Sequence, residues 1–306
     1  MSTPAWHPRE LLAELRFALD EGDAKSPPAH LLDRVLHVAY DARHPGRPFD
    51  GPESIGGAET FARGVASLDA TLVELTEADW ACPALRGLDV QGLVGHLIGV
   101  EEIFISALLG DSGDEAFDHI GSTQPYALAQ ADQPPAETLR RWQLLTARAM
   151  ELASERPPDQ EVAFYGVVLP LDQLLVIRAF EMWIHEEDVR CATGSTLNPP
   201  DPEPLSRMAE LAVALLPAGI ARASLPLGGQ AVRLVLTGPA GGTWTVALDG
   251  GSSAPGAAGA TVVVDTAAFC RVVGNRLAQS DTGAWIDGDR QLAADLFTGA
   301  ARLALD

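Results

Sequence analysis

The sequence is poor in cysteine and in basic residues. Its three cysteines, Cys82, Cys191 and Cys270, are too few and too far apart for a disulfide framework or a CxxC zinc motif. Lysine and arginine number 21 against 42 aspartates and glutamates, so the formal net charge is -21 at pH 7. Because so negative a surface repels phosphate backbones and anionic lipid, we expect neither a nucleic acid nor a membrane as partner.

The sequence also lacks an uninterrupted apolar segment long enough to cross a membrane. Residues 92–110 form the longest apolar stretch, and His96, Glu101 and Glu102 interrupt it. The first ten residues, MSTPAWHPRE, have neither the basic start nor the apolar stretch of a signal peptide. Together with the low cysteine content, these absences favour the cytoplasm, where thiols stay reduced.

What the sequence does contain is a series of amphipathic helical patterns. Two short patterns, at residues 8–20 and 27–42, predict an N-terminal helical extension over residues 1–50. Longer patterns follow at residues 57–77, 89–109, 135–153 and 170–193. Because apolar side chains recur there every three or four residues, we predict a four-helix bundle spanning residues 55–198.

The pattern changes after residue 200. A helical stretch at 206–219 precedes three β-rich runs, which lie at 231–238, 243–250 and 260–266. A helix at 267–276, a short strand at 284–289 and a last helix at 290–305 follow. These features predict a small α+β domain over residues 201–306, so the expected fold class is α plus α+β.

Three polar side chains interrupt the apolar faces of two bundle helices. Glu181 and His185 stand one turn apart in the fourth helix, and His96 lies in the second. Burying a carboxylate and imidazoles is costly unless they are paired or bind a metal. Two histidines and one glutamate leave a fourth position open on tetrahedral zinc, which is typical of catalytic sites. The alternative is a structural role without a metal, in which His96 is an ordinary core histidine and the Glu181/His185 spacing arose by chance.

The motifs around these residues resemble a known family. The segment DWACPALRGLDVQGLVGHL, residues 79–97, looks like its W-x-V-x-x-L-x-x-H-L pattern, and RAFEMWIHEEDVRCATG, residues 178–194, is similar to its R-x-x-E-x-x-x-H-x-x-D pattern. Together they resemble the mycothiol-dependent maleylpyruvate isomerase family of the DinB-like metalloenzyme superfamily. The runs WTVAL, TVVVD, GNR and WIDGD resemble that family's sterol-carrier-like C-terminal domain, so the resemblance covers about residues 57–306.

The resemblance implies which residues form the site. It implies Zn²⁺, or another divalent metal, bound by His96, Glu181 and His185, with mycothiol as co-substrate. It also implies that Arg276 binds an anion at the metal cleft, although a surface arginine is the alternative. Asp188 lies three residues after His185 and could accept its second ring N–H, or it could be an exposed acid at the helix end. His119, in the long connection after the second helix, could reach the site, but we expect it to be a solvated loop histidine.

An open zinc position predicts a particular chemistry. The metal would deprotonate a bound thiol, and the thiolate would attack a small electrophilic or anionic substrate, giving isomerisation or S-transfer. One alternative is a zinc hydrolase on the same bundle, with Glu102 or Asp188 as general base. Another is a non-catalytic small-molecule-binding or regulatory protein. We expect a monomer or homodimer with small-molecule partners only.

Overall fold

The computed structural model describes residues 34–35, 51–111, 118–225, 229–248 and 258–304. The chain divides into two compact units, Met1–Asp50 and Gly51–Asp306. The predicted helical extension over residues 1–50 lies outside the described residues, apart from residues 34–35, which are helical. Everything below concerns the second unit.

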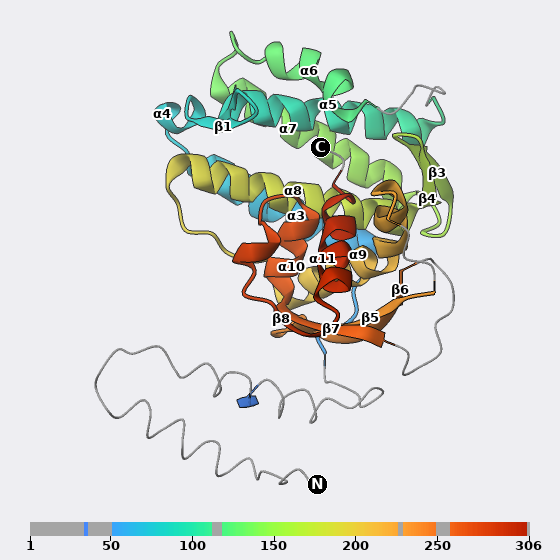
Figure 1. The fold of residues 1–306 in the computed structure, drawn as a ribbon. Helices are drawn as coiled ribbons and strands as arrows, with labels where there is room; N and C mark the ends of the chain where they lie inside the picture. Colours follow the sequence, from blue (N-terminus) through green and yellow to red (C-terminus); the bar gives the residue numbers. More distant parts are fainter. Residues whose placement is uncertain (1–33, 36–50, 112–117, 226–228, 249–257, 305–306) are drawn as a thin grey trace, which may run out of the picture. The chain divides into compact units, whose positions relative to one another are not determined.

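Four long helices form the predicted bundle: α3 (Gly57–Val73), α5 (Val90–Leu109), α7 (Pro135–Ser154) and α8 (Leu171–Thr193). Helix α3 packs along α8, and α7 packs along α5 (Figure 1). Asp89 caps the start of α5 by accepting the Gly92 N–H, as its sequence position predicts. Helices α5 and α8 end at left-handed glycines, Gly110 and Gly194, a backbone conformation that costs glycine little.

Small elements join these helices. Helix α4 (Glu77–Trp80) and the short strands β1 (Pro83–Leu85) and β2 (Leu88–Asp89) precede α5. Strands β3 (Glu161–Phe164) and β4 (Val167–Pro170) pair antiparallel before α8. Tyr165 and Gly166 form the two-residue turn between them and have φ values of 47° and 72°. A turn with both central residues at positive φ matches the right-handed twist of the two strands and so closes the hairpin.

The connection after α5 contains a helix that the sequence patterns did not predict. Helix α6 (His119–Leu128) packs closely on α5. Two glycines of α5, Gly95 and Gly99, make this approach possible. A Cβ on Gly95 would stand 2.8 Å from the Ala127 Cα, and one on Gly99 would stand 3.2 Å from the Thr123 Cα. The spacing G-x-x-x-G therefore seats α6 directly beside His96.

The C-terminal part is the predicted α+β unit. Helix α9 (Pro202–Arg222) leads into a four-stranded sheet of order β6-β5-β7-β8. Its strands are β5 (Ala231–Thr237), β6 (Gly242–Ala247), β7 (Ala258–Asp265) and β8 (Trp285–Gly288), of which only the β5–β7 pair is parallel. Helix α10 (Thr266–Val273), the 3₁₀ turn η1 (Gln279–Asp281) and α11 (Arg290–Ala301) complete it. The expected fold class is therefore confirmed.

Helix α8 contributes to two hydrophobic cores. Its residues Leu174 and Met182 belong to the core of the bundle. Val176, Trp183 and Ile184 belong to a second core, which α9, α10, α11 and the sheet complete. In Figure 1 the helices α9, α10 and α11 accordingly lie between α8 and the sheet. The boundaries 55–198 and 201–306 remain predictions, since α8 is shared by both cores.

Two helices, α5 and α9, are long and apolar enough by length and composition to cross a membrane. Within the described part of the chain, 72% and 56% of their apolar windows are buried inside the protein. Burial of this kind is common for the core helices of soluble proteins.

Candidate metal centre

Three helices direct imidazole and carboxylate groups to one buried point. Glu181 comes from α8, His96 from α5 and His119 from α6. The Glu181 Oε1 atom is 3.5 Å from the Nε2 atoms of both His96 and His119. His185, one turn after Glu181, has its ring centroid 5.3 Å from that of His96. The structure therefore brings the predicted ligands His96 and Glu181 together with His119, while His185 is in ring contact with His96 but lies outside this group of ligand atoms.

The two oxygens of Glu181 have different surroundings. Arg178, three residues earlier on α8, donates a hydrogen bond to Oε2. Oε1 is buried and accepts no hydrogen bond from any residue that the structure describes. A buried carboxylate oxygen without a donor is costly, and a bound cation removes that cost. Arg178 thus holds the carboxylate so that Oε1 faces the imidazoles.

Arg178 is fully buried between two carboxylates. It donates to Glu101 as well as to Glu181, and both Arg178 and Glu101 have no exposed surface. Burial raises the pKa of Glu101, against the effect of Arg178. Burial also opposes ionisation of Glu181, but the charge of Arg178 holds its pKa well below the ordinary value. With both carboxyl groups ionised, the trio carries one net negative charge, which suits a cation.

The spacing of these atoms fits a tetrahedral metal. Two ligand atoms that each lie ~2.1 Å from a zinc ion at a tetrahedral angle are about 3.4 Å apart. The two Nε2–Oε1 distances of 3.5 Å are close to this value. The candidate ligand atoms of His96, His119 and Glu181 all lie within 4.8 Å of one another. His96, His119 and Glu181 therefore have the spacing of ligands to one divalent metal.

Hydrogen bonds at the far ring nitrogens set the tautomers of two histidines. The Nδ1 of His96 is 2.8 Å from the Thr123 Oγ1, whose own hydroxyl donates to the His119 carbonyl. Nδ1 of His96 must then be the donor, which leaves the Nε2 lone pair directed at the site. Burial lowers the pKa of His96 to about 4, so this imidazole is neutral at physiological pH.

A similar arrangement orients His185. Its Nδ1 is 2.9 Å from the Asp188 Oδ2, and Arg276 donates to both oxygens of Asp188 at 2.7 and 2.8 Å. Burial opposes the ionisation of Asp188, but the hydrogen bonds from His185 and Arg276 lower its pKa to about 2. An ionised Asp188 accepts the Nδ1–H of His185 and leaves Nε2 free to bind a metal.

Two expectations about single residues need correction or refinement. The expectation that His119 is solvated was wrong, because the side chain is buried at the start of α6, in edge-to-face contact with His96. The G-x-x-x-G spacing on α5 is the signal that could have placed it there. Asp188 is buried, not an exposed acid at the helix end. Arg276 contacts Asp188 and the Gly274 carbonyl, and is absent from the residues that line the cavity described next.

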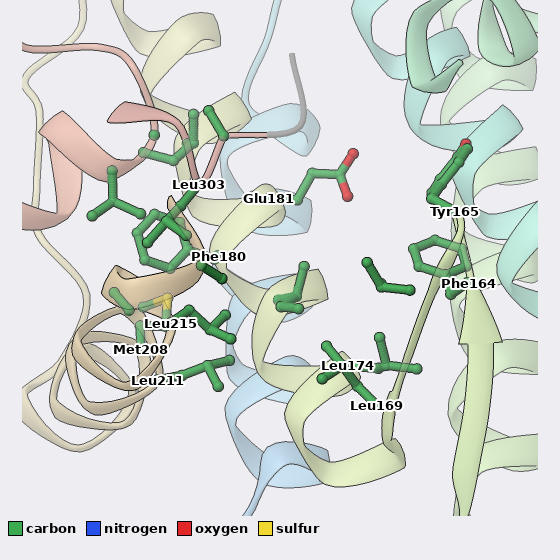
Figure 2. Close-up of a pocket in the computed structure, with 18 of the residues that line it drawn as sticks. Phe164, Tyr165, Leu169, Leu174, Phe180, Glu181, Met208, Leu211, Leu215 and Leu303 are labelled. Atoms are coloured by element: carbon green, nitrogen blue, oxygen red, sulfur yellow. The ribbon is translucent and has the colours of Figure 1, made fainter. Parts of the chain in front are cut away.

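A cavity of ≈ 430 Å³ opens beside this cluster. Its polar end is formed by His119, Tyr165, Glu181 and His185. Figure 2 shows the Glu181 carboxylate pointing into it from α8, with Phe164 and Tyr165 of the β3–β4 hairpin on one side and side chains of α9 on the other. The cavity therefore lies between the bundle and the C-terminal part, and its size is typical of small-molecule sites.

Tyr165 is a site residue that the sequence patterns did not suggest. It occupies the hairpin turn at positive φ, and its ring is 4.7 Å from that of His119. A non-glycine residue in this conformation is uncommon and often marks a functional position. Burial raises its pKa to about 12, so the phenol keeps its proton and can donate a hydrogen bond into the cavity.

Comparison with known proteins supports the resemblance for the bundle. Residues 61–190 match the family model described as the mycothiol maleylpyruvate isomerase N-terminal domain. Crystal structures of the mycothiol-dependent maleylpyruvate isomerase and of a mutant of it share the fold, each with a TM-score of 0.50 and 17% sequence identity. Each alignment covers 74% of this chain and 91% of the other chain. No curated protein matches the sequence significantly.

Proposed function

We propose that the protein is a metal-dependent enzyme that uses a low-molecular-weight thiol, mycothiol, because residues 61–190 match the family model of the mycothiol maleylpyruvate isomerase N-terminal domain. It would isomerise an electrophilic substrate or transfer sulfur to it, acting in the cytoplasm on small molecules only. The observation that carries this proposal is the Glu181 Oε1 atom, which is buried without a hydrogen-bond donor among the described residues and faces imidazole nitrogens beside a cavity that Glu181 lines.

We assign the metal to His96, Glu181 and His185. The choice of His185 over His119 rests on hydrogen bonding at the second ring nitrogen. Metal-binding histidines nearly always donate that N–H to a partner. His96 has Thr123 and His185 has Asp188, whereas Nδ1 of His119 has no partner among the described residues. His119 then stays beside the open coordination position.

Three protein ligands define what the chain supplies. A zinc ion held by them would keep one position open and would lower the pKa of a bound thiol. His96 and His185 would bind through Nε2, because their Nδ1 atoms face Thr123 and Asp188, and Arg178 fixes the orientation of Glu181. Asp188 and Arg276 are positioning residues: Asp188 accepts a hydrogen bond from Nδ1 of His185, and Arg276 orients Asp188. A substrate that fills the apolar cavity would displace water from the thiolate and so slow its protonation.

The covalent chemistry is conjugate addition. A thiolate adds to the β-carbon of a C=C bond conjugated with a carbonyl group, and the π electrons move to the carbonyl oxygen. The former C=C bond is now a single bond, about which the adduct can rotate. Loss of the thiolate then re-forms the double bond with the other geometry, with no net change in atoms. If a proton instead adds to the α-carbon, the C–S bond remains and the reaction is S-transfer. Tyr165 lines the cavity and accepts a hydrogen bond from Ser122, and in this proposal its phenol would donate to the oxygen that gains charge.

The hydrolase alternative has less support from the geometry. It needs a carboxylate free to act as a general base on water. Glu102 forms an ion pair with Arg141 on α7 and is not among the cavity-lining residues. Both oxygens of Asp188 accept hydrogen bonds from His185 and Arg276. Neither candidate base is available near the metal position.

Two measurements on purified protein test the proposal. Elemental analysis should give about one zinc or other divalent ion per chain for the wild type, far less for Glu181→Gln, and an unchanged value for Glu102→Gln. Consumption of unsaturated carbonyl compounds, including maleylpyruvate, should require mycothiol and the metal. Turnover that proceeds equally well without thiol would refute thiol use, and a metal-free active protein would refute the metal role.

A further inference from the structure

The cavity beside the metal cluster has apolar walls on three sides. The β3–β4 hairpin contributes aromatic and aliphatic side chains, such as Phe164 and Leu169, and α8 contributes others, such as Phe180. Helix α9 forms the third wall with Leu211 and Leu215. In Figure 2 these side chains surround the space into which Glu181 points. A ligand that fills this space makes contact mainly with carbon.

Positive charge is scarce in this cavity. Arg222, near the end of α9 and exposed, is the only lysine or arginine among the described residues that line it. The arginines nearby are engaged with carboxylates: Arg178 with Glu101 and Glu181, Arg271 with Glu187, and Arg276 with Asp188. The protein as a whole carries a net charge of -21. Apart from the metal proposed at the cluster, a small dianion would therefore find only Arg222 in this lining to offset its lost hydration.

The polar groups of the cavity gather at one end. His119, Tyr165, Glu181 and His185 all lie at the metal cluster, and the rest of the lining is apolar except for Arg222. A ligand that matches this distribution has one polar, reactive end and an apolar body. Burial of such a body is favourable in proportion to its area, whereas a second charge in the same place is penalised.

We propose that the substrate of this site is an apolar α,β-unsaturated carbonyl compound, with an aliphatic or aromatic body and at most one negative charge. The inference rests on the proposed function for the reactive group and on the cavity walls for the body. It separates this protein from an isomerase whose substrate, such as maleylpyruvate, is small and highly charged. The carbonyl end meets the metal cluster and Tyr165, and the body lies against α8, α9 and the hairpin.

Binding of unreactive probes tests the proposal without any thiol chemistry. Titration calorimetry on the full-length, metal-loaded protein compares 2-nonanone, which is neutral and apolar, with maleate, a small dianion. We expect 2-nonanone to bind at least tenfold more tightly than maleate. Maleate binding that equals or exceeds 2-nonanone binding would overturn the proposal.

Two variants locate the binding. Leu215→Glu places a carboxylate on the α9 wall and should weaken 2-nonanone binding at least tenfold, while Leu144→Glu, on the exposed face of α7, should leave it unchanged. Ala218→Trp, at an exposed position that lines the cavity, fills the space without adding charge and should also weaken binding. If Leu215→Glu does not fold, the binding measurement is made on Ala218→Trp instead. Unchanged affinity in the folded cavity variants would overturn the proposal.

A turnover assay keeps the two hypotheses separate. Wild-type protein is given mycothiol with either 3-nonen-2-one or maleylpyruvate, and the rate is compared with that of the uncatalysed addition. If 2-nonanone binds in the cavity but neither compound is turned over, the binding result supports the proposed substrate class and the absence of turnover refutes the proposed reaction. If maleylpyruvate is turned over with thiol and 2-nonanone does not bind, the reaction stands and the substrate class is wrong.

Discussion

Arg276 donates two hydrogen bonds to Asp188, through Nε at 2.7 Å and Nη2 at 2.8 Å. Asp188 also accepts from Nδ1 of His185, so one carboxylate connects the turn after α10 to an imidazole of the metal cluster. The bidentate geometry fixes the carboxylate plane and hence the direction of the ring. The C-terminal part of the chain therefore takes part in orienting a candidate metal ligand of the bundle.

This link predicts that Arg276→Gln weakens metal binding. Loss of the partner that orients a metal-binding histidine typically costs about 10- to 100-fold in metal affinity. Arg271→Gln is the matched control, because Arg271 joins the same two helices through Glu187 without touching His185 or Asp188. Zinc affinities measured by chelator competition should fall for Arg276→Gln alone. Equal losses in the two variants would mean that Arg276 only stabilises the interface.

Replacing each of the two candidate histidines, His185 and His119, by alanine tests which of them is the third metal ligand. His185→Ala should lose most of the bound metal, since we assign His185 as a ligand. His119→Ala should keep it, because Nδ1 of His119 has no partner to orient its ring among the described residues. Elemental analysis after desalting gives the stoichiometry, and circular dichroism verifies that each variant folds. Metal loss in His119→Ala with retention in His185→Ala would reverse the assignment.

The hydroxyl of Tyr165 should affect the rate more than binding. Tyr165→Phe should retain the metal but lower kcat by about 100-fold, which is typical of removing one donor to an oxygen that gains charge. Tyr126→Phe is the control, because Tyr126 packs against Gly99 of α5 and does not line the cavity. Steady-state kinetics separate the effects. A change in KM alone would show that the phenol binds substrate without assisting the reaction.

The close contact between α5 and α6 predicts opposite effects for two glycines of α5. Gly95→Ala would bring a Cβ to 2.8 Å from the Ala127 Cα, and such overpacking should lower the free energy of unfolding by about 1–3 kcal/mol. At Gly92 the nearest atoms are Leu88 Cδ2, which can move, and the capping Asp89 Oδ1, each at 3.2 Å, so no backbone of another helix is in the way. Gly92→Ala should then be neutral or stabilising by up to about 1 kcal/mol, because alanine favours helix. Urea denaturation measures both, and equal effects would contradict this account.

The amino-acid sequence determined the long helices, the strands of the C-terminal sheet and their order. Apolar spacing predicted the four long helices to within a few residues, and the caps at Asp89 and Gly194 marked their ends. The alternating runs after residue 230 predicted the sheet strands. These features depend on local periodicity and on the backbone preferences of single residues, which a sequence carries directly.

Tertiary structure decided which polar groups meet. His119 joins the cluster only because Gly95 and Gly99 let α6 lie against α5, and Arg276 reaches Asp188 only because α10 packs on α8. The apolar cavity has walls from the hairpin, α8 and α9, which are distant in sequence. Side-chain contacts between elements depend on packing distances and helix rotation, to which local patterns are insensitive. The sequence alone therefore indicated the ligands on α5 and α8, while the orientation of their rings and the character of the binding site came from the packed fold.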